Sequence, residues 1–446
     1  MDTKIVIIGA GITGLSLAHF LRKSGIDFIL LEKESEPGGK IKTLIKDDFT
    51  LECGPNTVLL KEPALKEIIS DLNLLESVIF ASKSIGKKRF VNTENGIFKI
   101  PSGPFSFFSS QLITFYDKWQ IIKDVFSKKS YSNESITVED YFNKKFSKNV
   151  TRKLIDPFVT GIYAGDISKM SFKHSFPTLY KADCEKGSLI KGFMSERKNN
   201  SKNEGIFSFE GGLNRLVQNL SNQIEHDLIL NAEVLSIDKQ NSGNFHIKIS
   251  DKQTTRTINS NFIVDTRALK ETAKSLNLNE SFPQIEYVPV VSMHLGFKTS
   301  DTLQVPKGFG VLNNKMANKK YLGCIFNSDI FPHTAPKDFR LFTLLIGGAR
   351  NPNYALNFDG KMRDEVIEDF SSTFNINVKP DFIHHFFWSA AIPQYNSGYN
   401  SVIESINKFH TANKNYFLLG NYNEGVSVGD CIKKAKKLSE LFINQY

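Results

Sequence analysis

The sequence contains 446 residues, of which 40% are hydrophobic and 23% are charged. These are the proportions of a globular protein with a large core and room for two or three domains. The net charge is +9, but the basic residues are dispersed and no nucleic-acid-binding motif accompanies them, which argues against a nucleic-acid partner.

The first forty residues predict a β–α–β unit that binds a dinucleotide. Lys4–Ile8 is a β-branched run typical of a strand buried on both faces. The glycine turn Gly9–Gly14 opens an apolar helical pattern, and a second strand, Phe28–Leu31, ends at Glu32. In such a turn the glycines permit a tight bend, a close approach to a pyrophosphate and helix–strand packing. The helix N-terminus attracts the phosphates, and Glu32 can accept hydrogen bonds from a ribose.

The residues after Glu32 indicate which dinucleotide is bound. Gly38 and Gly39 let the backbone lie close to a ligand, and Lys40 can reach a phosphate. This pattern resembles the FAD-binding proteins of the amine oxidase and protoporphyrinogen oxidase superfamily, where the basic residue is usually arginine. The resemblance implies FAD as the cofactor, with contacts from Gly9, Ala10, Gly11, Ile12, Thr13, Gly14, Glu32, Lys33, Gly39 and Lys40.

A further stretch of flavin contacts is expected where the strand in Asp48–Asn56 stops. By itself the Gly-Pro turn there carries little information. In the resembled superfamily a similar turn lies along the flavin, and the matching residues are Gly54, Pro55, Asn56 and Thr57. Glu62–Leu75 then has the spacing of a helix.

A hairpin is predicted from the strand Lys87–Val91, the turn at Asn95-Gly96 and the strand Ile97–Ile100. Within the superfamily this stretch resembles protoporphyrinogen oxidase, where the arginine faces the substrate cavity and pairs with a propionate. Arg89 matches that arginine, and a guanidinium presents a fixed fork to a carboxylate. The alternative is a surface arginine beside two lysines.

The segment from Phe105 to Asn203 is predicted to be mainly helical, with aromatic residues interleaved with lysines. Such a stripe is either a buried helical core or an amphipathic cap that rests on a membrane. Asp156–Asp166 closely resembles a Pro- and Gly-broken segment of the protoporphyrinogen oxidases, and Lys186–Glu204 predicts a mobile loop.

The chain then returns to the cofactor domain and builds a second sheet. Ile206–Leu220 predicts a strand, a glycine turn and a helix. It is followed by predicted strands at Ile229–Ile237, Phe245–Ile249 and Phe262–Val264. By resemblance, Val234 contacts the adenine side of FAD. The second sheet is expected from Pro289–Phe297, Phe309–Leu312, Tyr321–Phe326, Phe339–Leu345 and Asp381–Phe387, with a helix at Met362–Phe374. Trp388 follows in a superfamily motif that places it near the flavin.

The C-terminal stretch identifies the branch of the superfamily. Tyr416–Leu419 predicts a strand, and the residues from Gly420 to Ile432 resemble a strong signature of protoporphyrinogen oxidase. A helix that begins near Val428 would direct its N–H groups toward the cofactor domain and stabilise negative charge on the flavin. The implied flavin contacts are Gly420, Val426, Ser427 and Val428.

Neither the cysteines nor the histidines have the spacing of a metal site, and no metal is predicted. The four cysteines are expected to be reduced thiols. His384 and His385 are neighbours that would point in opposite directions on a strand. No acid, base or nucleophile stands out, so no catalytic side chain is assigned.

The resemblance implies an FAD-dependent oxidase of heme biosynthesis, acting on protoporphyrinogen IX or coproporphyrinogen III. In this family six electrons leave the macrocycle in pairs through flavin N5, and dioxygen is the expected acceptor. Two alternatives share the scaffold: an amine oxidase or carotenoid desaturase, and a flavin-free escort protein for lipidated partners. Arg89 disfavours the first modestly, and the intact glycine turn argues against the second.

The predicted fold is α/β, with a Rossmann-type FAD domain, a mixed-sheet substrate domain and a helical insertion. The FAD domain comprises residues 1–80, 205–267 and 388–446, the substrate domain 81–104 and 268–387, and the insertion 105–204. No apolar run approaches the roughly 20 residues that span a bilayer. The first strand begins at Lys4, which leaves no room for a signal peptide. A cytoplasmic protein is expected, with peripheral contact to the inner face of the membrane and a homodimer left open.

Overall fold

The structure is a computed structural model that describes residues 2–192, 204–251, 254–278 and 282–444. Its first sheet joins strands that lie far apart in the sequence, in the order β10-β2-β1-β13-β12-β11 with β19 beside β13. The strands are β1 (Asp2–Ile8), β2 (Phe28–Leu31), β10 (Leu228–Ile229), β11 (Ala232–Lys239), β12 (Phe245–Asp251), β13 (Thr254–Asp265) and β19 (Tyr416–Leu418). β1 pairs parallel with both β2 and β13.

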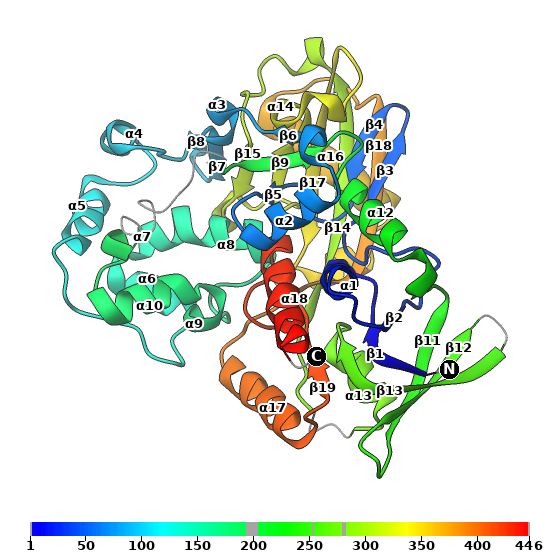
Figure 1. The fold of residues 1–446 in the computed structure, drawn as a ribbon. Coiled ribbons are helices and arrows are strands. Elements are labelled where there is room, and N and C mark those ends of the chain that lie inside the picture. The colour runs from blue at the N-terminus through cyan, green and yellow to red at the C-terminus, as the bar shows by residue number, and fades with distance from the viewer. Residues whose placement is uncertain (1, 193–203, 252–253, 279–281, 445–446) are drawn as a thin grey trace.

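Alternate residues of β1 enter two different apolar cores. Ile5 and Ile7 join the core under α1 (Ile12–Lys23), α2 (Pro63–Asp71), α12 (Asn214–Gln223) and α18 (Val428–Ile443). Val6 and Ile8 join the core on the opposite face, with α13 (Leu269–Ser275) and α17 (Tyr399–Ala412). Burial on both faces explains why the strand is an unbroken β-branched run. Figure 1 shows α18, at the C-terminus, beside α1, at the N-terminus.

The second sheet has the order β18-β14-β17-β16-β15-β7-β8. Its strands are β7 (Arg89–Thr93), β8 (Gly96–Lys99), β14 (Tyr287–Lys298), β15 (Gly310–Asn313), β16 (Gly323–Phe326), β17 (Phe339–Gly347) and β18 (Phe382–Pro393). One face packs against α16 (Gly360–Phe374), where Phe342 and Phe370 lie in one core with Phe90 packed against it. Because side chains alternate along β7, Arg89 lies on the other face from Phe90.

Two small sheets lie beside these. β3 (Thr43–Lys46) and β4 (Phe49–Glu52) form a hairpin. β9 (Ile206–Phe209) pairs with both β5 (Val58–Leu59) and β6 (Val78–Phe80). Glu52, at the end of the hairpin, is buried and accepts hydrogen bonds from the Leu213 backbone N–H at 2.7 Å and the Thr43 hydroxyl at 2.8 Å. The hairpin is thereby joined to the turn before α12.

Glu52 is expected to make stability depend on pH. Burial raises the pKa of Glu52 from 4.5 to about 7, against the opposing effect of its two hydrogen bonds. The folded protein therefore holds this proton more tightly than the unfolded chain. Its favourable contribution is complete below pH 4.5 and is lost as the pH rises to about 7.

In the variant Glu52→Gln, the amide oxygen can still accept the hydrogen bond from Leu213 N–H. The glutamine side chain cannot ionise. As the pH rises from about 5 to about 8, the melting temperature of this variant should increase relative to that of the wild-type protein. Parallel pH profiles of the two melting temperatures would contradict the role of Glu52.

The helical insertion contains α4 (Pro104–Ser109), α5 (Phe115–Asp124), α6 (Val138–Lys145), α7 (Lys148–Val150), a π-helical turn at Thr151–Ile155, α8 (Asp156–Tyr163), α9 (Phe172–Ser175) and α10 (Pro177–Lys186). It has its own core, in which the Tyr141 and Phe172 rings stack at 3.7 Å. The buried Lys145 amine lies 3.0 Å from Asp124 and 2.8 Å from Asp183. In the described part of this chain, no helix combines the length and apolar character needed to pass through a bilayer.

The predicted strands and helices are present, with differences in their limits. The strand predicted at Ile229–Ile237 is two strands, because Asn231 has φ +56° and interrupts the extended backbone. The strand predicted at Asp381–Phe387 continues to Pro393 and so includes Trp388. Within the predicted loop Lys186–Glu204, residues 189–192 are helical, and residues 193–203 lie outside the described residues.

Candidate active site

The glycines of the turn have two different roles. The fold requires Gly9 and Gly14, whereas Gly11 faces open space. Gly9 has φ +99°, and its N–H donates to the Leu31 carbonyl at 2.7 Å. A Cβ at Gly14 would lie 2.0 Å from the Gly9 carbonyl oxygen, so α1 can cross β1 only with glycine there. A Cβ at Gly11 would meet no atom within 4 Å. The turn therefore leaves room for a ligand beside Gly11.

The start of α1 is suited to phosphate. No side chain of the described residues caps this helix, so N–H groups of its first turn are available to an anion at the positive end of the helix dipole. Buried Glu32 accepts hydrogen bonds from Ala10 N–H at 2.8 Å and Glu34 N–H at 3.0 Å. These bonds fix its carboxylate beside the turn, and its remaining lone pairs can accept from ribose hydroxyls.

Gly38 and Gly39 pack against the glycine turn Gly9–Gly14. Gly38 N–H donates to the Ala10 carbonyl at 2.8 Å, and a Cβ at Gly39 would lie 3.2 Å from the Gly11 Cα. Val234, on β11, follows Ala232, whose N–H donates to the Glu32 carbonyl at 2.8 Å. Gly39 thus lies beside Gly11, and Val234 lies two residues beyond the strand contact with Glu32. The Lys33 side chain instead is exposed, with its amine 3.9 Å from Glu34.

Lys40, Trp388 and the turn at Gly54 meet although they are far apart in the chain. The Lys40 amine donates to the Ala390 carbonyl at 2.5 Å and lies 4.6 Å from the centre of the Trp388 ring. Trp388 Nε1 donates to the Cys53 carbonyl at 2.7 Å. A Cβ at Gly54 would lie 1.9 Å from the Lys40 carbonyl oxygen, so these backbones approach closely. Desolvation, then repulsion from Lys33, lowers the pKa of Lys40 to about 8.

The strip from Gly54 to Thr57 leads from this group to the second sheet. Asn56 donates through Nδ2 to the Gly54 carbonyl at 3.1 Å and accepts from Asn327 Nδ2 at 2.9 Å. Asn327 begins α14 (Asn327–Ile330), directly after β16. Pro55 and Thr57 are partly accessible in this strip, and Val58 then pairs with Phe207. The strip therefore connects the backbone at Lys40 with the second sheet.

The loop after Gly420 is held by buried polar groups that the sequence pattern did not indicate. The Lys434 amine donates to the carbonyls of Gly420 at 2.7 Å and Gly425 at 3.0 Å, and to that of Asn423. The hydroxyls of Tyr395 and Tyr399 donate to the carbonyls of Asn421 and Tyr422, at 2.6 and 2.5 Å respectively. Only the contacts reveal these roles, since Lys434 lies within an ordinary lysine-rich helix.

The two ends of the chain meet in the first core. Ile12, at the start of α1, and Val428, at the start of α18, both pack against it. Ser427 caps α18 by accepting from Asp430 N–H at 3.1 Å. Val426 packs against the core of the helical insertion. The N-terminal glycine turn and Val426–Val428 are therefore parts of one region, as the resemblance predicts.

Arg89 is a half-buried cation without a carboxylate partner in the described part of the chain. Its guanidinium lies 4.6 Å from the centre of the Phe309 ring, and its buried Nε has no hydrogen-bond partner. Burial lowers the pKa of Arg89, although the guanidinium stays charged. A partly desolvated, unpaired cation is unfavourable by itself and suits an anionic ligand.

The register of the second sheet places Arg89 in a row of side chains on one face. Arg89 pairs with Gly310, Gly310 with Ile325, and Ile325 with Thr343. Thr343 pairs with His294, which pairs with His384. The next row along the strands contains Val91, Leu312, Gly323, Leu345, Ser292 and Phe386. These two rows are called the Arg89 face below.

The apolar part of the Arg89 face is close to α8. A Cβ at Gly161 would lie 2.8 Å from Leu312 Cδ2, so this glycine lets α8 approach β15. Leu312, Ile325 and Leu345 are only half-buried although they lie in a sheet interior. Farther along, fully buried His294 hydrogen-bonds Thr343 at 2.9 Å, and burial, with the neighbouring His384, lowers the pKa of His294 to about 3. The face thus offers one cation and apolar side chains, with a neutral histidine beyond them.

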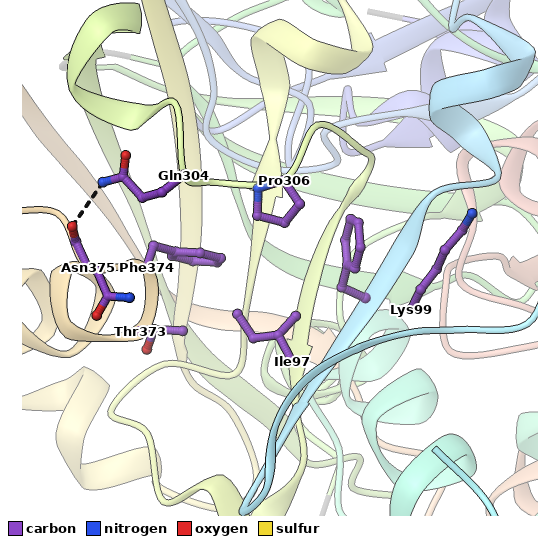
Figure 2. A pocket seen from close by; sticks show the side chains of 8 residues that line it. Ile97, Lys99, Gln304, Pro306, Thr373, Phe374 and Asn375 are labelled. Carbon is purple, nitrogen blue, oxygen red and sulfur yellow. Dashed lines mark hydrogen bonds between the residues drawn. The ribbon is translucent and has the colours of Figure 1, made fainter. Parts of the chain in front are cut away.

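A cavity of about 460 Å³ lies on the opposite face of the same sheet. Its lining residues are Phe90, Ile97, Lys99, Gln304, Pro306, Thr373, Phe374 and Asn375. Figure 2 shows Gln304 donating to the Asn375 carbonyl at its edge and the Lys99 amine directed away from Ile97. Because Phe90 and Arg89 alternate along β7, this cavity is separate from the Arg89 face.

The described part of the chain places no metal site beside these groups. Within the described residues, no three His, Cys, Asp or Glu side chains are grouped so that they could hold an ion. Cys53, Cys324 and Cys431 are buried free thiols, and Cys184 is an exposed one. The residues present do fit FAD: an uncapped helix start, open space at Gly11, a fixed acid at Glu32 and a cation at Lys40 lie together.

Comparison with known proteins agrees with this geometry. The family described as flavin containing amine oxidoreductase matches residues 12–441. Protoporphyrinogen oxidase 2 of Arabidopsis thaliana is 30% identical over 99% of this chain and 94% of its own length. Coproporphyrinogen III oxidase of Bacillus subtilis is 25% identical over 97% of this chain and 96% of its own length.

The fold is also shared with solved structures. A candidate protoporphyrinogen oxidase from an Exiguobacterium species has a TM-score of 0.84 and 21% identity, covering 100% of this chain and 99% of its own. A putrescine oxidase bound to putrescine has a TM-score of 0.74 and 12% identity with the same coverage. These similarities confirm the predicted fold class. The chain therefore belongs to the flavin-containing amine oxidoreductases, is an FAD-dependent enzyme, and has full-length relatives among the protoporphyrinogen and coproporphyrinogen oxidases.

Proposed function

We propose that this enzyme oxidises a porphyrinogen to the corresponding porphyrin in heme biosynthesis, with protoporphyrinogen IX or coproporphyrinogen III as substrate and dioxygen as electron acceptor. The observation that carries the proposal is the guanidinium of Arg89, which has no carboxylate partner among the described residues and lies beside half-buried apolar side chains. A porphyrinogen has the matching chemistry, since it is an apolar macrocycle with carboxylate side chains. The similarity to oxidases named for both substrates supports the same reaction.

The side chains of this enzyme mainly bind and orient the substrate. Arg89 holds a propionate through its fixed fork of N–H donors. Leu312, Ile325 and Leu345 pack against the macrocycle and exclude water from it. When bound, FAD supplies the two-electron chemistry, and removal of six electrons takes three rounds. Because Arg89 and the apolar residues act by positioning the substrate, this role is consistent with the sequence analysis, which assigned no acid–base pair.

The flavin contacts and the domain limits predicted above belong to the same proposal. The pyrophosphate would lie against Gly11 and the start of α1, the ribose against Glu32, and the adenine side toward Val234. The residues from Gly54 to Thr57, with Lys40 and Trp388, would line the path toward the second sheet. Residues 420–428 would close the site from the C-terminal side.

The test is an assay of the purified protein with both porphyrinogens, prepared without oxygen and then exposed to air. Flavin absorption bands, with porphyrin fluorescence that appears as the porphyrinogen disappears, would support the proposal. Turnover of a primary amine or a carotene, without any porphyrin product, would favour the alternative enzyme classes. A folded, colourless protein that takes up no FAD would favour the escort protein.

We further propose that the enzyme is cytoplasmic and rests on the inner face of the membrane through α4 and α5. Figure 1 shows these helices at the edge of the molecule, beyond β7 and β8 of the second sheet. Phe105, Phe115 and Phe126 are 87%, 85% and 79% exposed. Other exposed apolar side chains here are Phe108, Tyr116, Trp119 and Ile122. Exposed aromatics of this size and clustering favour the membrane cap over the buried core.

The charge of this region suits anionic lipid. Lys123 lies 5.0 Å from the centre of the Trp119 ring, and Lys128 and Lys129 are exposed just beyond Phe126. Lysines next to interfacial aromatics gain about 1 kcal/mol each from an anionic surface. A homodimer stays a prediction.

Removing two of the exposed aromatic side chains should weaken membrane binding. In a vesicle sedimentation assay, the wild-type protein should bind vesicles that contain phosphatidylglycerol and bind uncharged phosphatidylcholine vesicles less. Phe105→Ser combined with Phe115→Ser should reduce binding about tenfold or more, because each phenylalanine contributes about 1.5–3 kcal/mol when buried. Leu303→Ser, at a 78% exposed leucine elsewhere, is the control. Equal binding of all three proteins would contradict the assigned surface.

A further inference from the structure

The buried amine of Lys434, in the second turn of α18, binds the loop that joins β19 to α18. It donates to the carbonyls of Gly420 at 2.7 Å and Gly425 at 3.0 Å, and to that of Asn423. A lysine ammonium has three N–H donors, so each donor meets one carbonyl. A neutral amine has one N–H fewer and would leave a carbonyl without its donor. The three contacts therefore favour the charged form of Lys434.

The charge of Lys434 is not neutralised by an ion pair among the described residues. Desolvation by burial lowers the pKa of Lys434, while the charges of Asp430 and Glu424 act in the opposite direction. The Asp430 carboxylate instead accepts from the Ser427 hydroxyl at 2.6 Å and from its N–H at 3.2 Å. Lys434 thus brings a buried positive charge to the loop that precedes α18.

The contacts of Lys434 also orient the N–H groups of the loop. The described peptide bonds are trans, so the N–H of each peptide unit points opposite to its carbonyl. Because the carbonyls of Gly420 and Gly425 are directed at Lys434, the N–H groups of Asn421 and Val426 point away from it. Neither N–H donates to a described protein group. Both are therefore available to a ligand on the side of the loop opposite Lys434.

The loop is not held in this form by its own backbone. Between its own backbone groups it has one described hydrogen bond, a long one from Asn423 N–H to the Gly420 carbonyl at 3.4 Å. Glu424 has φ +53°, which is unfavourable for a residue with a side chain. Gly425 has φ +106°. Local preference therefore does not specify the loop, and the three bonds from Lys434 are needed to stabilise it.

We infer that Lys434 is a positioning residue for FAD. Its ammonium holds residues 420–426 in the form that closes the cofactor site, and its charge favours the flavin in its reduced, negatively charged form. This inference rests on the part of the proposed function that places residues 420–428 at the cofactor. A charge removed from water acts more strongly on its surroundings than an exposed one, which is why a buried lysine can affect the flavin without touching it.

The first test replaces Lys434 with methionine, which keeps the apolar stem and removes the donors and the charge. Titration of the full-length apoprotein with FAD should give a Kd about tenfold or more higher, because the loop carbonyls lose strong donors. The midpoint potential of the bound flavin should fall by about 30 mV or more, which corresponds to a tenfold change for a two-electron couple. A lysine with only a structural role would not change this potential.

Two further variants make the result specific. Lys433→Met is the matched control, since Lys433 precedes Lys434 on the same helix but is exposed. It should have the wild-type Kd and potential. Lys434→Gln keeps N–H donors without the charge, and its flavin potential should fall as in Lys434→Met. Thermal unfolding of each apoprotein reports whether it is folded, and if Lys434→Met fails to fold, the potential of Lys434→Gln decides the question.

The outcomes separate this inference from the proposed function. An unchanged Kd for FAD in folded Lys434→Met overturns the positioning of the loop. A wild-type flavin potential in the Lys434 variants, or an equal fall in Lys433→Met, overturns the effect of the Lys434 charge. None of these measurements uses a porphyrinogen. A flavin-loaded enzyme that oxidises neither porphyrinogen therefore overturns the proposed function and leaves the role of Lys434 standing.

Discussion

Replacing Arg89 with alanine is expected to raise KM for the porphyrinogen roughly 30- to 150-fold. The guanidinium would lose a charge-assisted, bidentate contact to a propionate, and hydrogen bonds to charged groups contribute about 2–3 kcal/mol. Because Arg89 lies on the second sheet and not at the glycine turn, the flavin content should not change. Steady-state kinetics with either porphyrinogen and the flavin absorbance measure these two effects separately.

Two further variants make the result specific to Arg89. Arg89→Lys keeps the charge but loses the planar fork, so it should recover only part of the lost affinity. Lys99→Ala removes a cation from the neighbouring strand β8, where Lys99 pairs across from Phe90 rather than Arg89. This variant should have the wild-type KM. A wild-type KM for Arg89→Ala would remove Arg89 from the substrate site.

Replacing Gly11 with alanine is expected to lower FAD affinity about tenfold or more while the protein stays folded. The new methyl group meets no protein atom within 4 Å, and Gly11 has φ −72°, which alanine adopts freely. The space beside it is where the pyrophosphate would approach the backbone. Overpacking by one methyl group costs about 1–3 kcal/mol, so flavin absorbance and FAD titration of the apoprotein should report the loss.

Gly14→Ala provides the contrast, because its methyl group would lie 2.0 Å from the Gly9 carbonyl oxygen. It should destabilise the apoprotein as well as weaken FAD binding. Gly86→Ala, at a position with nothing within 4 Å, controls for the substitution alone. If Gly11→Ala binds FAD like the wild-type protein, the pyrophosphate does not pass beside Gly11. Thermal unfolding without FAD distinguishes the fold from the ligand in each case.

Local sequence patterns predicted those parts of this enzyme whose structure depends on residues that are neighbours in the sequence. The β-branched run, the glycine turn and Glu32 specify one β–α–β unit, because strand composition, turn geometry and helix start all act within a few residues. The alternation in β18 likewise placed His384 and His385 on opposite faces, as the register confirms. Resemblance added the family, which the comparisons confirm.

The amino-acid sequence by itself determined the cofactor unit, the strands and helices, and the family to which the enzyme belongs. Only the tertiary structure decided that Arg89 has no carboxylate partner in the described residues, that Ile325 shares its face, and that Phe105 and Phe115 are exposed. The hydrogen bonds from the Lys434 amine to backbone carbonyls also became known only from the structure. The physical reason is that periodicity encodes which side chains of one element share a face. Strand register and contacts between distant segments decide what that face meets.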